Sequence, residues 1–318
     1  MLDSYGRNIN YLRISITDLC NLRCRYCMPE EGIGKKGHKD ILSVEEIIEI
    51  ARVFTSLGIN KVRLTGGEPL VRRGILDIVK GVGKLEGIED FAMTTNGILL
   101  KKYARDLKIL GLNRVNISLD TLNGEKYSHI TRGGHLEDVL EGINEAKKAG
   151  LNPIKINTVL TKGINDTEIE DLIYWAEREG LDIRFIELMP IGEAAKFESS
   201  YFISNSIVLE KLPELIEIEK EDISSPANYY KLPNGKSKIG LINPISCKFC
   251  KYCNRMRITA QGKLKPCLHS KEEIDLKTPL RNGEDIEKII LDAIYRKPKE
   301  HNLESGEYIN TNMNEIGG

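Results

Sequence analysis

Six short apolar runs alternate with helical stretches from residue 11 to residue 189, and this alternation constrains the fold of the 318-residue chain more than any other feature. Runs of this kind are typical of strands buried on both faces of a parallel sheet. Six such units favour an incomplete (β/α)6 TIM-type barrel, with a doubly wound open sheet as the alternative. In either fold, a ligand site is expected at the C-terminal ends of the strands. The runs are residues 11–16, 61–64, 91–95, 114–119, 154–159 and 183–188.

The helical stretches have recognisable ends. Ser43 and Glu46 form a capping-box pattern before an apolar stripe, and Gly58 follows as a stop signal. Asn165 and Glu168 predict a similar start for a helix that ends at Gly180. The sequence therefore predicts helices that cover the outside of the strands.

After residue 190 this rhythm is lost, and prolines and glycines become frequent. We assign residues 1–219 to the barrel. Residues 220–318 form a C-terminal region that covers the barrel, holds the last four cysteines and includes a helix near residues 284–295. The chain ends in Gly317-Gly318.

The composition limits the partners. A net charge of −1 provides no global positive field for nucleic acid or for an anionic membrane surface. No stretch resembles a signal peptide or a membrane span, so a cytoplasmic protein is expected. An anionic substrate would have to be bound by local arginines and lysines.

The seven cysteines fall into two groups, which indicates metal ligation and argues against disulfides. Cys20, Cys24 and Cys27 directly follow the first predicted strand. Three thiolates can hold a [4Fe–4S] cluster and leave one iron open to another ligand. A structural zinc site needs four ligands, and no histidine lies nearer than His38.

The second group is Cys250, Cys253 and Cys267, again three thiolates suited to a cluster. Cys247 forms a further Cys-x2-Cys pair with Cys250, which complicates the choice of ligands. His269 could instead complete a zinc site with three of these cysteines.

Arg255 and Arg257 lie two positions apart, so on an extended segment they point the same way. Two guanidinium groups that face one cavity suit a triphosphate. The arginines Arg13, Arg63 and Arg184 lie within otherwise apolar runs, where an anionic ligand would compensate their buried charge.

The first cysteine motif, followed by Met28-Pro29, resembles the signature of the radical S-adenosylmethionine (SAM) superfamily. The sequence Gly66-Gly67-Glu68-Pro69 after the second run resembles the loop that binds the SAM amino group in that superfamily. The resemblance implies that the open iron chelates SAM, and that one electron cleaves SAM to methionine and a 5′-deoxyadenosyl radical.

The second motif, Cys-x2-Cys-Asn-Arg-x-Arg-x-Thr-x2-Gly-x4-Cys, resembles that of the GTP 3′,8-cyclases, the molybdenum cofactor biosynthesis protein A family. This resemblance extends from residue 13 to the terminal Gly-Gly. It implies a radical SAM lyase that converts GTP to (8S)-3′,8-cyclo-7,8-dihydroguanosine 5′-triphosphate, the first step of molybdenum cofactor biosynthesis. It also implies a second [4Fe–4S] cluster whose open iron contacts guanine. Cys247 has no counterpart among the family ligands, so the resemblance implies that it is a bystander, although exchange with Cys250 stays open.

The same resemblance implies the site residues. The implied catalytic residues are Arg255, Arg257, Gly317 and Gly318. Contacts to SAM fall to Tyr26, Gly67, Ser118 and Met189. Contacts to GTP fall to Arg13, Arg63, Thr94, Lys155, Arg184, Arg255 and Arg257.

The family resemblance further implies a homodimer, an electron donor that the sequence does not identify, and cyclic pyranopterin monophosphate synthase as the downstream enzyme. Two alternatives stay open at this point. One is a radical SAM enzyme with an auxiliary cluster that acts on a peptide. The other is a zinc-stabilised, non-catalytic binding protein.

Overall fold

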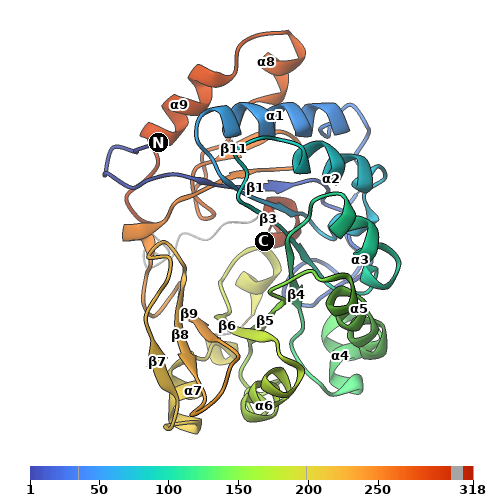
Figure 1. The fold of residues 1–318 in the computed structure, drawn as a ribbon, viewed down its shortest axis with the longest axis vertical. Coiled ribbons are helices and arrows are strands. Elements are labelled where there is room, and N and C mark those ends of the chain that lie inside the picture. Colours follow the sequence, from blue (N-terminus) through green and yellow to red (C-terminus); the bar gives the residue numbers. More distant parts are fainter. Residues whose placement is uncertain (35, 198, 302–310, 318) are drawn as a thin grey trace.

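The computed structural model describes residues 1–34, 36–197, 199–301 and 311–317 (Figure 1). Within these residues one sheet contains six parallel strands that follow one another in sequence order, which confirms the predicted partial barrel. These strands are β1 (Tyr11–Ser15), β2 (Lys61–Thr65), β3 (Asp90–Thr95), β4 (Arg114–Ser118), β5 (Lys155–Leu160) and β6 (Asp182–Glu187).

The C-terminal region extends both edges of this sheet. Strand β10 (Arg255–Ile258) pairs in parallel with β1, and β9 (Ile239–Ile242) pairs in parallel with β6. The region therefore contributes two parallel strands to the barrel wall. Beyond these strands the sheet continues in antiparallel pairs, with β11 (Lys263–Lys265) and β12 (Ile274–Asp275) at one edge, and β8 (Ala227–Lys231) and β7 (Ile216–Ile218) at the other.

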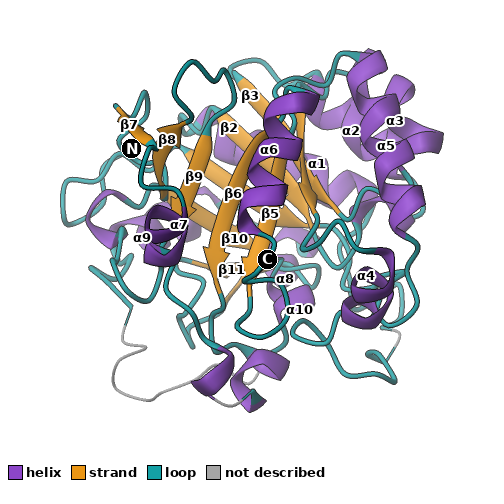
Figure 2. Ribbon diagram, turned by 90° about the horizontal axis from the view of Figure 1, so that it is seen from below, coloured by secondary structure: helices purple, strands orange, loops and turns teal. Residues whose placement is uncertain are grey.

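Helices lie along the outer side of the barrel strands (Figures 1 and 2). They are α1 (Val44–Ser56), α2 (Ile75–Gly83), α3 (Leu100–Ile109), α4 (Gly124–Thr131), α5 (Leu136–Ala149) and α6 (Ile169–Glu179). The later helices are α7 (Ser206–Lys211), α8 (Lys277–Arg281), α9 (Glu287–Tyr295) and α10 (Met313–Ile316). Short 3-10 turns are η1 (Pro69–Val71), η2 (Gly192–Lys196), η3 (Ser199–Tyr201) and η4 (Cys250–Tyr252).

The capping box at the start of α1 is confirmed: Glu46 N donates to Ser43 Oγ at 3.1 Å, and Ser43 N donates to Glu46 Oε2 at 2.7 Å. The predicted capping by Asn165 before α6 is wrong, because Glu168 is the N-cap residue and makes no side-chain capping bond. The Asn165 amide instead donates to Asp120 O and Val159 O, both at 2.9 Å. A tertiary contact thus uses the side chain that the local pattern had assigned to the helix.

Residues along the barrel strands alternate between the core and the inside of the barrel. In β1, Leu12 and Ile14 are buried in the core under the helices, whereas Arg13 lines an internal cavity. In β10, Met256 enters the same core and its neighbours line the cavity. The two-residue period of strands therefore keeps the apolar side chains in the core and directs the arginines inward.

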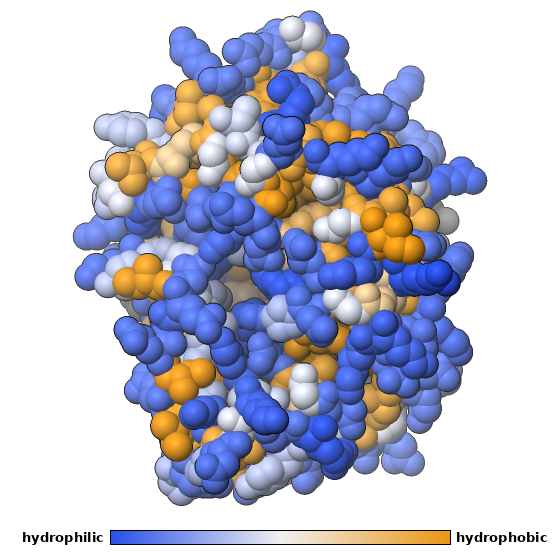
Figure 3. Space-filling view, in the orientation of Figure 1, coloured by the Kyte–Doolittle hydropathy of each residue, from blue (hydrophilic) through white to orange (hydrophobic). Residues whose placement is uncertain are grey.

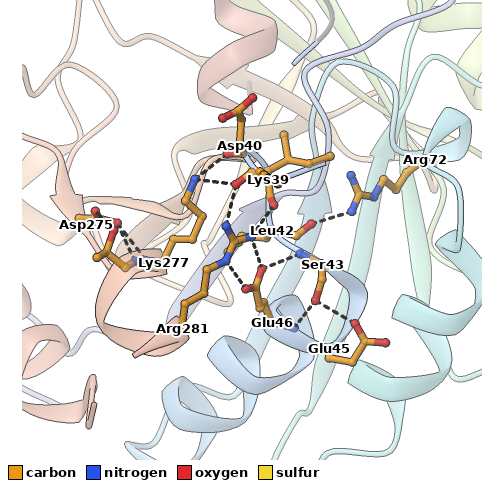
Figure 4. A network of polar contacts seen from close by, with 12 residues as sticks. Lys39, Asp40, Leu42, Ser43, Glu45, Glu46, Arg72, Asp275, Lys277 and Arg281 are labelled. Carbon is orange, nitrogen blue, oxygen red and sulfur yellow. Dashed lines mark hydrogen bonds and ion pairs between the residues drawn. The ribbon is translucent and has the colours of Figure 1, made fainter. Parts of the chain in front are cut away.

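A network of polar contacts joins the C-terminal region to the start of α1 (Figure 4). Arg281 in α8 donates to the carboxylate of Glu46 at 2.6 and 3.1 Å, and to the carbonyl oxygens of Lys39 and Ile41. Lys277 Nζ donates to Lys39 O and to Asp40 O. These bonds fix α8 against the segment between the first cysteine motif and α1.

Across the parts of the chain that the structure describes, none of the helices has the length and apolar character of a membrane span.

Candidate active site

One internal cavity of about 560 Å³ lies within the barrel. Its lining includes the three cysteines of each motif: Cys20, Cys24, Cys27, Cys250, Cys253 and Cys267. Two motifs that are far apart in sequence therefore face a common space.

The face of the molecule in Figure 3 is mainly hydrophilic, with apolar residues scattered over it.

The first motif lies in the loop after β1. The amide N–H of Cys27 donates to the carbonyl oxygen of Cys24 at 2.9 Å, which closes a turn between these ligands. Gly67 N donates to Thr17 O at 2.8 Å, so the glycine loop after β2 packs directly on the cysteine loop. A Cβ atom on Gly67 would lie 2.4 Å from Leu19 O. Glycine is required here because the two backbones approach closely.

The thiols of the first motif are largely removed from water. Burial raises the pKa of Cys20 to about 11 and that of Cys27 to about 12. None of the seven cysteines forms a disulfide. Thiolates in such surroundings need a cation beside them, and the irons of a cluster supply that charge. The donor set therefore fits an iron–sulfur cluster.

Tyr26, expected to contact SAM, is held by a residue that the sequence did not single out. The Tyr26 hydroxyl donates to Asp120 Oδ2 at 2.7 Å, and Asp120 Oδ1 accepts from Val159 N at 2.8 Å. Burial raises the pKa of Asp120 to about 6. Asp120 follows the end of β4, but its contact with Tyr26 depends on the tertiary fold.

The second motif begins at η4 and continues into β10, while Cys267 follows β11. Burial alone would raise the pKa of Cys253, but the positive charges of Lys297 and Arg255 lower it to about 7. Cys247 is exposed and is not among the residues that line the cavity. His269 lines the cavity with its ring 4.7 Å from that of His301.

Basic side chains gather along the lining of this cavity. Burial, together with mutual repulsion, lowers the pKa of Arg13 to about 9 and that of Arg257 to about 10. Burial lowers the pKa of Arg63 to about 9, and burial with Arg184 nearby lowers that of Lys155 to about 7. Because these cations crowd a space shielded from water, an anion bound there would stabilise all of them.

All predicted contact residues of the barrel face this cavity. The predicted SAM set lines it, namely Tyr26, Gly67, Ser118 and Met189. The predicted GTP set lines it as well, namely Arg13, Arg63, Thr94, Lys155, Arg184, Arg255 and Arg257. The carbonyl oxygen of Gly317 accepts a hydrogen bond from Arg257 at 2.9 Å, whereas Gly318 lies outside the described residues.

The expected position at the C-terminal strand ends is only partly right. The first motif lies there, but Lys155 opens β5, and Arg13 and Arg63 are the third residues of their strands. The basic part of the cavity therefore lies deeper in the barrel. Sequence reasoning missed Arg114, which lines the cavity and binds Asp90 at 2.8 and 2.5 Å. Its only sequence signal was a charge at the start of an apolar run.

Residues 14–176 match the family described as the radical SAM superfamily, and residues 181–303 match Molybdenum Cofactor Synthesis C. Over its full length, the chain is 59% identical to the GTP 3′,8-cyclase of Peptoclostridium acidaminophilum and covers 98% of that protein. It is 55% identical, again over its full length, to the GTP 3′,8-cyclase of Alkaliphilus oremlandii, all of which it covers. The chain belongs to the GTP 3′,8-cyclase family of the radical SAM superfamily.

Among solved structures, Streptococcus suis SuiB bound to S-adenosylmethionine has a TM-score of 0.66 and 16% sequence identity. The match covers 91% of this chain and 67% of SuiB. At this identity the likeness concerns the fold, which is the partial barrel described above.

As a radical SAM family member, this chain is an enzyme that uses a [4Fe–4S] cluster together with SAM. Cys20, Cys24 and Cys27, whose spacing resembles the family motif, line the cavity together. Membership in an enzyme family removes the zinc-stabilised, non-catalytic alternative. Within the described ranges, no group of three or more His, Cys, Asp or Glu side chains could hold a single metal ion.

Proposed function

We propose that this chain is a GTP 3′,8-cyclase that carries out the first step of molybdenum cofactor biosynthesis. The observation that carries this proposal is one cavity that is lined both by the two three-cysteine motifs and by a group of buried cations. An enzyme that cleaves SAM at one end and holds a nucleoside triphosphate beside it needs this arrangement. The relatives at 59% and 55% identity are named for the same reaction.

We assign the first cluster to Cys20, Cys24 and Cys27, and a second [4Fe–4S] cluster to Cys250, Cys253 and Cys267. When bound, the first cluster with SAM would supply the 5′-deoxyadenosyl radical chemistry needed to remove a hydrogen atom from ribose C3′ of GTP. The C3′ radical bonds to guanine C8, and one electron and one proton then complete the cyclised product. Further contacts to SAM are assigned to Tyr26, Gly67, Ser118 and Met189.

The task of the protein is to place C3′ of GTP beside the radical. We assign contacts to GTP to Arg13, Arg63, Thr94, Lys155, Arg184, Arg255 and Arg257, and the second cluster, when bound, would contact the guanine. Charge-assisted bonds from several guanidinium groups fix a triphosphate in one orientation. This orientation matters because a displacement of about 1 Å can cost on the order of 100-fold in rate.

We further propose a functional division at residue 220, with the radical SAM barrel before it and the auxiliary-cluster region after it. A cytoplasmic homodimer is proposed from the family resemblance. The product would pass to cyclic pyranopterin monophosphate synthase, and a separate protein would supply electrons.

The test uses anaerobically reconstituted protein with reductant, SAM and GTP, and follows 5′-deoxyadenosine and nucleotides by mass spectrometry. We expect deoxyadenosine together with an isomer of GTP. Deoxyadenosine formed without any change in GTP would contradict the cyclase proposal and favour the peptide-modifying alternative.

A further inference from the structure

Lys297 lies just after α9 and is only 2% exposed, yet it is among the residues that line the cavity. Lys297 Nζ donates to Arg255 O at 2.8 Å and also to Pro266 O. Arg255 follows Cys253 by two residues, and Pro266 directly precedes Cys267. One buried ammonium group therefore ties together two of the segments that carry cysteines of the second motif.

Arg7 connects Cys250, the remaining cysteine of the second motif, to the segment that follows α9. Its Nη1 atom donates to Cys250 O at 3.0 Å and to Lys299 O at 2.9 Å. Its Nη2 atom donates to Pro298 O at 2.8 Å and to Lys297 O at 3.3 Å. The segment 297–299 is thus bonded, directly or through Arg7, to all three parts of the chain that carry the second motif.

The two cations differ in how their charge is balanced. Arg7 Nε forms an ion pair with Asp3 Oδ2 at 2.5 Å. For Lys297, the described residues provide no ion pair with a carboxylate. Burial lowers the pKa of Lys297, and the negative groups that act against this effect are the thiolates of Cys253 and Cys267. An ammonium group buried without a counter-ion is costly, so its position is best explained by the negative charge of ligating thiolates.

We propose that Lys297 is a positioning residue of the second cluster, which holds the Cys253 and Cys267 segments in register and balances the charge of the ligated cluster. This inference rests on the proposed function, which assigns a cluster to these cysteines. A positive charge next to a cluster stabilises its reduced form, because reduction adds negative charge. Removal of that charge must therefore lower the reduction potential of the second cluster.

The experiment isolates the second cluster in a chain that carries Cys20→Ala, Cys24→Ala and Cys27→Ala, and it needs no turnover. Iron and sulfide content report occupancy, and an EPR-monitored redox titration reports the potential. Lys297→Gln keeps a donor but loses the charge, so we expect near-normal iron content with a lower potential. Lys297→Met loses the donors as well, so we expect lower iron content too.

Lys265→Met is the matched control. Lys265 is also 2% exposed and lies two residues before Cys267, but it bonds to Ser270 O at 2.8 Å and to Glu273 at 3.1 Å. We expect this variant to keep both the iron content and the potential. An unchanged potential in Lys297→Gln, or equal losses in the two Met variants, would overturn the inference. Absence of a cluster from the isolating chain itself would instead refute the second-cluster part of the proposed function.

Discussion

Arg257 Nη1 donates a hydrogen bond of 2.9 Å to the carbonyl oxygen of Gly317, so the second cysteine motif and the C-terminal tail meet beside the cavity. The tail is held there from the other side as well. Asn314 Nδ2 donates to Asp18 O at 2.9 Å, and Lys36 pairs with Glu315 at 3.2 Å. Because Asp18 and Lys36 flank the first cysteine motif in sequence, the tail bridges both ends of the proposed site.

Gly317→Ala is expected to slow cyclisation strongly without loss of iron. Gly317 has a φ of +75°, and an added Cβ would lie 2.6 Å from Thr65 Oγ1 and 2.8 Å from Ser15 Cβ. Both the backbone strain and the contacts would displace the tail, and we expect product formation to fall by about 100-fold. Gly283→Ala is the control, because Gly283 has a φ of +73° with open space around it. Equal rates in the two variants, measured by mass spectrometry, would show that the tail position is unimportant.

Cys24→Ala is expected to abolish SAM cleavage, because two thiolates cannot hold the first cluster in the geometry that leaves one iron open. Deoxyadenosine should fall to background, and about four irons per chain should be lost. Cys247→Ala is the control, since Cys247 is exposed and does not line the cavity. Deoxyadenosine formation that persists in Cys24→Ala would contradict the assignment of the first motif. A loss in Cys247→Ala would show that this cysteine is more than a bystander.

The sequence was sufficient for the barrel and for three of the arginines that line its cavity, Arg13, Arg63 and Arg184. Arg13 between Leu12 and Ile14 illustrates the reason, because the period of a strand fixes which side chains share a face. A charge inside an apolar run then marks the face that is not core. This rule depends only on neighbouring residues in the strand, and the observed core and cavity lining agree with it.

The residues that sequence reasoning missed depend on distant pairings. Tyr229 meets Arg184 only because β8 pairs with β9 and β9 pairs with β6. Lys297 meets the second motif only because the chain returns after α9. Short strands rich in polar residues, prolines and glycines carry a weak periodic signal, so neither contact could be inferred from local patterns.

GTP binding is expected to take up a proton at Lys155. Burial and the nearby arginines lower the pKa of Lys155 to about 7 in the free enzyme, and bound phosphates would raise it. Below pH 7 the Lys155 amine is already protonated in the free enzyme, so GTP binding no longer takes up a proton there. Above pH 7 the free group is increasingly neutral, so GTP affinity should weaken as the pH rises. Calorimetry at pH 8 in two buffers of different ionisation enthalpy measures the uptake.

The variant Lys155→Met should remove most of this proton uptake and weaken binding at pH 7. Lys61→Met is the comparison, because Lys61 also lines the cavity but forms an ion pair with Asp222 at 2.5 Å. Its proton uptake should equal that of the unmodified chain. The same uptake in Lys155→Met as in the unmodified chain would mean that Lys155 does not bind the phosphates.

Tyr229→Phe is expected to weaken GTP binding and to leave SAM binding unchanged. Arg184 Nη2 donates to Tyr229 Oη at 2.6 Å, and the Arg184 guanidinium lies 5.8 Å from the ring centroid. Loss of the hydroxyl leaves the ring in place but frees the guanidinium to rotate, and we expect the KM for GTP to rise about tenfold, or about 1.4 kcal/mol. Tyr230→Phe alters the neighbouring residue, which does not line the cavity, and should have little effect. Equal KM values for GTP in the two variants would show that Tyr229 does not orient Arg184 for the substrate.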